Sequence, residues 1–223
     1  MDALGFIDCC DNRGEILFPW IREIVLEKNP DDVLDFGCGD ARFSLQLAPH
    51  IRGRVAAYDR DPHMREQARR RIAAEGNVRV SLCEQPEVDW EGKFDVIFML
   101  GVWMCWKTHA ECVETLGLLA GSLKPNGILI ASVTHPSFRD RAFATYHTDF
   151  SASHYMANGT PFRVFVGKRG QEVEIDDTHW NLEAMISQVR QAGLMLTDLK
   201  EHADGRSGEM PSWLSLVLST QGR

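Results

Sequence analysis

The sequence predicts an α/β protein with a doubly wound, mostly parallel sheet of seven strands, an antiparallel C-terminal strand and a cap-like insertion after the fifth strand. Three observations lead to this fold class. Short apolar runs alternate with helix-competent segments between residues 32 and 133, which is typical of right-handed strand–helix–strand crossovers. The run ILI at 128–130 is apolar throughout, as in a strand buried on both faces. Two strand-like segments flank a polar loop at 203–212, as in an antiparallel pair.

The expected elements follow one another along the chain. An apolar stripe predicts an N-terminal helix over 14–27, with Pro19 tolerated only near its first turn. Strands are expected at 32–36, 54–58, 78–82, 94–99 and 127–133. Helices are expected at 41–48, 62–75 and 109–123, the last ending at the turn residues of 124–127. A final helix over 180–192 precedes the segments LMLTDLKEH and SWLSLVLST.

We expect the 223 residues to form one domain, because no linker, repeat or low-complexity tract divides the chain. Residues 1–29 are interpreted as a helical lid. Residues 135–178 are interpreted as a cap insertion, since they contain no convincing core helix. Within that insertion, FRVFVGKRGQEVEI predicts a hairpin that turns at 168–170.

Composition excludes several classes of function. A formal net charge of −8 argues against a nucleic-acid partner, and the basic run at 69–71 is interpreted as a solvated helix face. The six cysteines include no C-x-x-C pair and no metal spacing with histidine, so we expect reduced thiols and no metal. The chain shows neither a signal-like start nor 18 consecutive apolar residues, so a cytoplasmic protein without a membrane span is expected.

The stretch VLDFGCGDARFS at 33–44 begins as a strand and ends in small residues before a helix-competent segment. Glycines in such a turn let the backbone approach a ligand closely. The next strand ends at Asp59, 20 positions after Gly39, where an acid can accept both hydroxyls of a ribose. Because ligands of open α/β sheets bind at the carboxyl ends of strands, the turn and the acid together predict an adenosine-containing cofactor.

Two charged residues narrow the choice of cofactor. Arg42 stands where the nicotinamide-dinucleotide motif G-x-G-x-x-G has its third glycine, and Asp40 adds negative charge to the turn. Both features disfavour a pyrophosphate and favour a cofactor without phosphates. Purely structural roles stay open: Asp35 as a helix cap, Asp59 as an Asx-turn residue and Met64 as a core residue.

VLDFGCGDARFS and AAYDRDPHMREQARRR resemble the first two motifs of the class I S-adenosylmethionine-dependent methyltransferases, with Ala41 in place of the last glycine of D/E-x-G-x-G-x-G. The stretches KFDVIFMLGVW, LKPNGILIASV and SWLSLVLS resemble the family's later sheet elements, so the resemblance covers 30–220. It implies a Rossmann-like fold and S-adenosyl-L-methionine as the cofactor. HPSF at 135–138 and His179 are more narrowly similar to small-molecule methyltransferases.

The resemblance also implies a role for each residue of the cofactor site. The methionine portion is expected over the glycine turn, with Asp35 reaching its ammonium group, and Asp59 is expected to hold the ribose. Arg60 and Met64 would line the adenine pocket, and Cys83 stands where the family has an acid for the adenine amine. Glu84, next to Cys83, or the backbone is expected to meet the adenine amine instead. Gly37, Cys38 and Gly39 are the expected contacts in the turn, and Leu100 is expected close to the sulfonium methyl group.

Methyl transfer needs a general base only when the acceptor is a poorly ionised hydroxyl or a protonated amine. His135, at the end of the fifth strand, is the first candidate, and His179, before the last core helix, is the second. A structural role stays open for both. Aromatic side chains that could surround the acceptor, or form a small core of the insertion instead, are Trp103, Trp106, Phe138 and Tyr146.

The expected function is transfer of a methyl group to an oxygen or nitrogen of a small-molecule acceptor, with secondary metabolism as one setting. Two alternatives remain: a non-catalytic S-adenosylmethionine-binding module, and a methyltransferase that acts on a peptide or protein. A nucleotide-dependent oxidoreductase is disfavoured by Arg42 and by the acidic turn. A monomer and a homodimer are equally compatible with the sequence.

Overall fold

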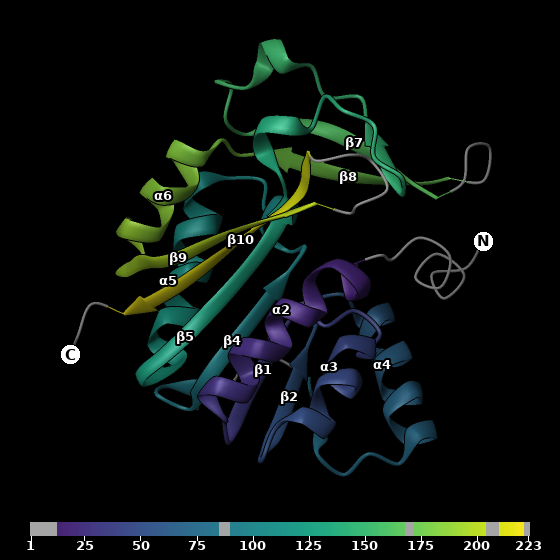
Figure 1. The fold of residues 1–223 in the computed structure, drawn as a ribbon, viewed down its shortest axis with the longest axis vertical. Helices are drawn as coiled ribbons and strands as arrows, with labels where there is room; N and C mark the ends of the chain where they lie inside the picture. Colours follow the sequence, from purple (N-terminus) through teal and green to yellow (C-terminus); the bar gives the residue numbers. More distant parts are fainter. Residues whose placement is uncertain (1–12, 85–89, 168–171, 204–209, 221–223) are drawn as a thin grey trace.

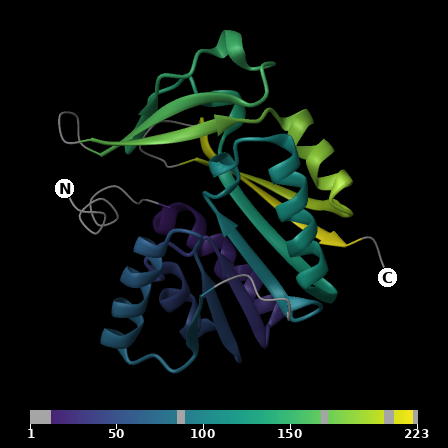
Figure 2. The ribbon, with the colours of Figure 1, turned by 180° about the vertical axis from the view of Figure 1, so that it is seen from behind.

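The computed structural model describes residues 13–84, 90–167, 172–203 and 210–220. They form a seven-stranded sheet with helices on both faces and a separate three-stranded sheet (Figures 1 and 2). Figure 1 shows the smaller sheet beyond the ends of the central strands, on the side to which those strands point. The larger sheet carries the main core, and the smaller one forms a cap on it.

The large sheet has the strand order β3-β2-β1-β4-β5-β10-β9. Neighbouring strands from β3 to β5 are parallel, β10 is antiparallel to β5, and β9 is antiparallel to β10. The strands are β1 (Asp32–Phe36), β2 (Arg54–Tyr58), β3 (Val80–Cys83), β4 (Phe94–Leu100), β5 (Leu123–Thr134), β9 (Leu194–Ala203) and β10 (Pro211–Thr220). This arrangement confirms the predicted fold class. The order reverses between β1 and β4, so their carboxyl ends frame the crevice in which such sheets bind ligands.

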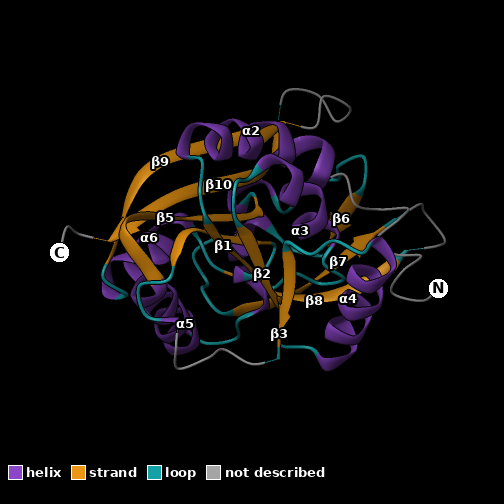
Figure 3. Cartoon of the chain, turned by 90° about the horizontal axis from the view of Figure 1, so that it is seen from below, coloured by secondary structure: helices purple, strands orange, loops and turns teal. Residues whose placement is uncertain are grey.

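Helices cover the two faces of this sheet (Figure 3). α2 (Arg13–Lys28) and α3 (Arg42–Leu47) lie on one face, and α5 (His109–Ser122) and α6 (Leu182–Gln191) lie on the other. α4 (Pro62–Glu75) follows β2 and packs on α3. Each helix buries an apolar side against the sheet, and α2 does so with Leu17, Ile21 and Val25.

Two elements differ from their predicted form. Pro19 lies in the second turn of α2 rather than the first, and the burial of Leu17 and Ile21 around it offsets the hydrogen bond that proline cannot make. β5 begins at Leu123 and takes in 124–127, which were expected to be a turn. The register with β4 jumps between Phe94 and Val96, so these residues form an irregularity at the start of the strand.

The cap sheet is antiparallel and consists of β6 (Tyr146–Thr148), β7 (Thr160–Val166) and β8 (Val173–His179). The predicted hairpin is confirmed as β7 and β8, while its expected turn at 168–170 lies outside the described residues. One face of the cap sheet carries a small apolar core of its own, formed by Tyr146, Phe150, Phe162 and Val164.

No helix within the described ranges has the length and apolar character needed to cross a membrane. The cysteines in the same ranges, Cys38, Cys83, Cys105 and Cys112, are free thiols. The described residues also contain no cluster of histidine, cysteine and acidic side chains that could hold a metal ion.

Candidate active site

The turn after β1 places three residues in the left-handed backbone region. Gly37, Gly39 and Ala41 have φ angles of 82°, 57° and 62°. A Cβ atom at Gly37 would lie 2.2 Å from Cγ2 of Val102, whereas one at Gly39 would meet no atom within 4 Å. Gly37 is therefore required for packing against the segment after β4, while Gly39 leaves space beside the backbone. Ala41 adopts a conformation that favours glycine, the residue at this place in the motif it resembles.

A cavity of about 600 Å³ opens beside this turn. It lies between the turn, α3 and the first half of α2, and it reaches Leu100 at the end of β4. Among its lining residues are four predicted cofactor contacts in the turn, Asp35, Gly37, Cys38 and Gly39. Residues of the lining that the sequence did not single out are Glu15, Leu17, Phe18, Phe43, Gln46 and His50.

Acidic side chains give the turn a negative field. Asp35 is 2% exposed, and its Oδ2 accepts a hydrogen bond of 2.5 Å from the Ser44 hydroxyl. Asp40 is also buried and lies next to the same turn. Burial, followed by the charges of Asp35, Asp59 and Asp40, raises the pKa of the Cys38 thiol well above its usual value. Cys38 therefore stays protonated and is not a nucleophile.

The basic run of α4 is only partly a solvated face. Arg69 and Arg70 pair with Glu66 on the same helix, and both arginine side chains are about half exposed or more. Arg71 instead points inward, where its Nη2 lies 2.6 Å from Oδ2 of Asp40. The interpretation of the whole run as solvated was wrong for Arg71, which ties α4 to the glycine turn.

Asp59 connects the end of β2 to the same turn. Its Oδ2 accepts a hydrogen bond from the Gly39 N–H at 2.8 Å, and its Oδ1 accepts one from the Asp61 N–H at 2.9 Å. The second bond is the Asx turn that was left open as an alternative. Each carboxylate oxygen retains a lone pair, so these bonds are compatible with ribose hydroxyls as further donors. The ribose-binding role of Asp59 remains a prediction.

The remaining predicted adenosine contacts lie at the ends of β2 and β3. Arg60 donates to Glu111 Oε1 at 3.1 Å and to the Cys105 carbonyl at 3.3 Å. Glu84 accepts from Arg69 at 2.6 Å. Both are exposed side chains with protein partners, and Met64 and Cys83 are half-buried near them. The adjacency of β3, β2 and β1 brings all four to one edge of the sheet.

His135 occupies a capping position. Its Nδ1 accepts from the Ser137 N–H at 3.3 Å, and its Nε2 lies 2.9 Å from Oε1 of Glu201. Its ring is buried against Phe138, with centroids 4.7 Å apart. Burial, only partly offset by Glu201, lowers the pKa of His135. Both ring nitrogens are engaged, which supports the structural role over the catalytic one.

His179 is fully buried at the base of the cap. Arg139 donates through Nη1 to its Nδ1 at 2.7 Å, which leaves Nε2 as the N–H that donates to the Tyr155 carbonyl at 2.8 Å. Burial, followed by the charge of Arg139, lowers the pKa of His179 to about 4. Its catalytic role stays a prediction, but this geometry gives it the part of a neutral connector.

The predicted acceptor-binding aromatics lie mostly in the two cores. Trp103 and Trp106 belong to the main core, and the Trp103 indole donates to Oε1 of Gln188 at 2.9 Å. Tyr146 lies in the cap core, where its hydroxyl donates to the Ser212 carbonyl at 2.8 Å. Phe138 is half-buried on His135. The structure thus places these four apart from the cavity beside Gly39, and their contact with an acceptor remains a prediction.

A family model described as a methyltransferase domain matches residues 33–127 of this chain. The match includes the glycine turn and Asp59. A search of curated protein sequences gives no significant match.

Solved structures of methyltransferases share the fold. An S-adenosylmethionine-dependent methyltransferase from Clostridium acetobutylicum has a TM-score of 0.65 at 15% identity, and the match covers 92% of this chain and 90% of that one. The CcbJ methyltransferase from Streptomyces caelestis has a TM-score of 0.67 at 14% identity, with 90% and 94% covered.

A third similar structure was solved with ligands. The 1,6-didemethyltoxoflavin-N1-methyltransferase from Burkholderia thailandensis, with bound 1,6-didemethyltoxoflavin and S-adenosylhomocysteine, has a TM-score of 0.58 at 17% identity. The match covers 91% of this chain and 76% of that one. Together with the domain match over residues 33–127, these structures show that the chain has the fold of S-adenosylmethionine-dependent methyltransferases.

Proposed function

We propose that this chain is a class I S-adenosylmethionine-dependent methyltransferase and that it transfers the methyl group of S-adenosylmethionine to an oxygen or nitrogen of a small-molecule acceptor, with secondary metabolism as one setting. The observation that carries the proposal is the cavity of about 600 Å³ between the glycine turn and α2. A cavity of this volume is in the range of sites for small organic ligands. Its walls are side chains of two helices and a turn, which suits a small acceptor better than a folded macromolecule.

The residues around the turn fit the methyl donor. Gly39 leaves space beside the backbone, as a closely approaching ligand requires. Asp35 and Asp59 supply carboxylates at the two ends of the turn, next to the buried Asp40. S-adenosylmethionine carries a sulfonium and an ammonium group but no phosphate, so this negative field favours it over a nucleotide.

The chain's own contribution to the reaction is orientation. When bound, S-adenosylmethionine supplies an electrophilic methyl group. Holding two reactants in line contributes about 7–11 kcal/mol to lowering a barrier, without any dedicated acid or base. Asp35 is oriented by Ser44, and Asp59 is oriented by two backbone N–H groups, so neither carboxylate has to reorganise before binding.

The Burkholderia enzyme, whose structure contains 1,6-didemethyltoxoflavin, supports a small-molecule acceptor. A peptide acceptor and a non-catalytic binding module are the alternatives. We retain the predictions of a cytoplasmic monomer or homodimer that binds neither nucleic acid nor membranes. The domain organisation, with 1–29 as a lid and 135–178 as a cap, is part of the same proposal.

The test combines binding with turnover. Calorimetric titration of the purified protein with S-adenosylmethionine and S-adenosylhomocysteine should show binding of both. Incubation with methyl-labelled S-adenosylmethionine and separate panels of small phenols, small amines and peptides should label the small molecules. Labelling of peptides alone would overturn the small-molecule proposal, and donor binding with no labelling in any panel would favour the non-catalytic module.

A further inference from the structure

A positive charge is buried where the cap meets the large sheet. Arg139 follows the short helix η4 (Pro136–Phe138), which continues the chain after β5, and this arginine is 2% exposed. Burial lowers its pKa to about 10, so the guanidinium is charged at neutral pH. Within the described ranges, no acidic side chain forms an ion pair with it. A buried charge without an ionic partner is unfavourable, so this arginine needs an explanation.

The hydrogen bonds of Arg139 do not neutralise its charge. Nη1 donates to Nδ1 of the neutral His179 at 2.7 Å, and Nη2 donates to the Thr134 carbonyl at 3.5 Å. Nε is buried and has no partner among the described residues. The charge of Asp177, which is 5% exposed on β8, opposes the effect of burial on the pKa of Arg139 only in part. Because a guanidinium carries five N–H groups, Arg139 retains donors for a further acceptor.

A cavity of about 380 Å³ adjoins Arg139. Residues of η4 and of the short helix η5 (Ala152–His154) in the cap contribute to its lining. Its volume is within the range of sites for small organic ligands. Among the described residues, none lines both this cavity and the one beside the glycine turn. The lining residues that bear on a ligand are Ser137, Arg139, Asp140, Phe150, Ala152 and Tyr155.

The walls of this cavity suit a planar anion. Phe150 and Tyr155 offer aromatic rings, and Ser137 adds a hydroxyl that can donate a hydrogen bond. Arg139 is the one cation of the described lining. Asp140, the one acid of that lining, lies 3.7 Å from the Arg141 guanidinium, which offsets its charge. A single guanidinium matches the charge and the two oxygens of a carboxylate better than a more highly charged phosphate.

We propose that this cavity binds a small aromatic carboxylate, at a site separate from the one of the proposed function. The carboxylate accepts hydrogen bonds from the Arg139 guanidinium and the Ser137 hydroxyl, and the ring lies against Phe150 and Tyr155. The ligand supplies an ionic partner for Arg139 and joins η4 to η5. Its binding therefore stabilises the cap on the large sheet.

A purely structural role for Arg139 is the alternative. Its guanidinium carbon lies 5.0 Å from the centroid of the Phe162 ring in the cap core, and its hydrogen bonds join Thr134 at the end of β5 to His179 at the end of β8. That role explains the two Nη atoms but neither the unpartnered Nε nor the adjoining cavity. If Arg139 serves structure alone, a carboxylate binds here no more tightly than its uncharged amide. Charge selectivity therefore separates the two roles.

The experiment is a calorimetric titration of the full chain with benzoate, phenylacetate and hydrocinnamate, and with the amide of each acid as its uncharged isostere. Acetate and inorganic phosphate test the need for the ring and for a carboxylate, and each titration is repeated with saturating S-adenosylhomocysteine. Arg139→Gln removes the charge, and Ala152→Trp fills the cavity without altering Arg139. Arg163→Gln is the matched control, an exposed arginine of β7 outside the described lining. Thermal unfolding followed by circular dichroism establishes that each variant folds.

We expect the best of these acids to bind about tenfold more tightly than its amide, acetate or phosphate, whether or not S-adenosylhomocysteine is present. Its affinity should fall about tenfold in Arg139→Gln and in Ala152→Trp and stay unchanged in Arg163→Gln. If Arg139→Gln does not fold, the result for Ala152→Trp decides. The proposal is overturned if no acid binds, if acid and amide bind equally, or if phosphate binds more tightly. Competition with S-adenosylhomocysteine, or full affinity in Ala152→Trp, would place the ligand elsewhere and overturn it as well.

Discussion

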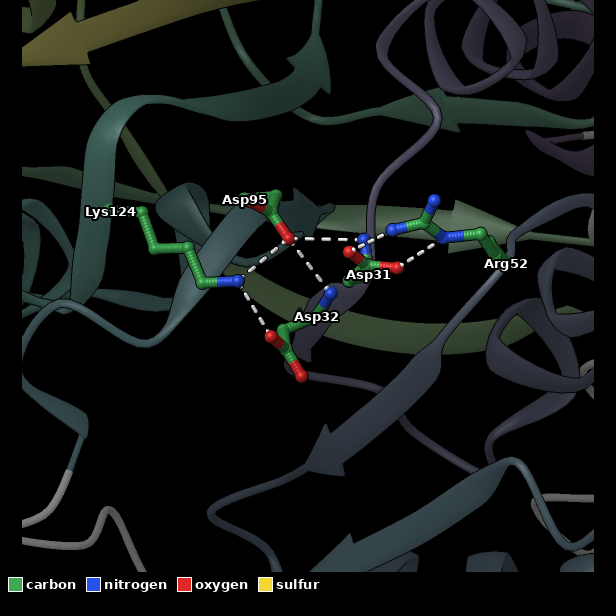
Figure 4. Close-up of polar contacts among 5 residues, drawn as sticks. All are labelled: Asp31, Asp32, Arg52, Asp95 and Lys124. Atoms are coloured by element: carbon green, nitrogen blue, oxygen red, sulfur yellow. Dashed lines mark hydrogen bonds and ion pairs between the residues drawn. The ribbon is translucent and has the colours of Figure 1, made fainter.

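The two ends of the large sheet contrast in how their polar groups are satisfied. At the amino ends, Asp95 of β4 accepts hydrogen bonds through Oδ2 from the N–H groups of Asp31 and Asp32, at 3.1 and 2.9 Å (Figure 4). Lys124 at the start of β5 donates to Asp95 at 3.0 Å and to Asp32 at 2.6 Å. Three strands are thereby joined where they begin.

A second pair extends this network to the segment before β2. Arg52 donates through two nitrogens to the two oxygens of Asp31, at 2.7 and 2.5 Å (Figure 4). The bidentate bond and the charge of Arg52 lower the pKa of Asp31. At Gly53 a Cβ would lie 1.6 Å from the Asp31 carbonyl oxygen, so the backbones meet closely here.

The carboxyl ends are built differently. There the chain holds the left-handed turn at Gly37 and Gly39, a cavity and several buried acids. Asp177 has no described donor, whereas Asp95 has three. Groups that are satisfied within the protein stabilise it, and groups left without partners are available to a ligand. The comparison teaches that the amino ends of the sheet serve stability alone, whereas the carboxyl ends combine packing, as at Gly37, with an open cavity.

Gly37→Ala should have the largest effect on stability, and it sharpens the contrast between the two glycines. The new Cβ would clash with Val102, and alanine is disfavoured at a φ of 82°. Together these costs are about 3 kcal/mol in the free energy of unfolding. Chemical denaturation measures this loss of stability. Adding Val102→Ala should recover the portion that comes from the clash with the Val102 side chain. Unchanged stability in Gly37→Ala would show that the turn rearranges freely.

Asp95→Ala tests the network at the amino ends of the strands. It should lower the free energy of unfolding by about 2 kcal/mol, because two backbone N–H groups and Lys124 lose their acceptor. Burial opposes ionisation, but the hydrogen bonds from Asp32, Lys124 and Asp31 outweigh it and lower the pKa of Asp95. The lowered pKa means that its contribution is present at neutral pH and is lost as pH falls below about 3.8. Denaturation at pH 7 and pH 3 measures both effects. A loss at pH 7 that persists unchanged at pH 3 would contradict the electrostatic explanation.

Asp177→Asn should stabilise the protein at neutral pH by roughly 1–2 kcal/mol. The pKa of Asp177 is raised from 3.8 to about 6 by burial, so the folded state binds the proton more tightly than the unfolded chain. Stability is therefore highest below pH 3.8 and falls as pH rises through about 6. Unfolding curves of wild type and variant should converge at pH 4. A destabilised variant at pH 7.5 would show that Asp177 has a donor at that pH.

Ala41→Gly should have the smallest effect, an increase of about 0.5 kcal/mol in the free energy of unfolding. Relief of the left-handed conformation at a φ of 62° outweighs the entropy that glycine loses on folding. Thermal unfolding of the two proteins checks it, with S-adenosylhomocysteine affinity as a control that should not change. A loss of stability would mean that the buried Ala41 methyl group contributes more through packing than its conformation costs.

The strands were predictable because their apolar runs are short and bounded by turn residues. The shape of the turn was predictable because its backbone geometry dictates the residue type at Gly37 and Gly39, and strand order placed Asp59 beside it. The inward direction of the Arg71 side chain could not be predicted, because its neighbours at 69 and 70 face solvent in the same basic run. The partners of His135 and His179 lie 66 and 40 residues away, at Glu201 and Arg139, and no local pattern reveals such contacts.

The contribution of α2 to the cavity wall could not be predicted from the sequence either. Phe18 flanks the apolar stripe of its helix, and only the packing of α2 on the sheet brings it to the turn at Gly39. The burial of Asp177 follows from the pairing of β8 with β7 and from the packing of β8 on the short helix η3 (Trp103–Cys105). A sequence shows an acid in a strand, but the face it occupies depends on a register set by the fold.

The most direct test of this division is a titration of S-adenosylhomocysteine into three proteins: wild type, Gly39→Ala and Asp95→Ala. Gly39→Ala adds a methyl group in open space beside the cavity, and Asp95→Ala weakens the opposite end of the sheet. We predict at least tenfold weaker binding for Gly39→Ala and unchanged affinity for Asp95→Ala at a temperature where both are folded. Equal affinity of Gly39→Ala and wild type, or a selective loss in Asp95→Ala, would contradict the placement of the cofactor site at the carboxyl ends of the strands.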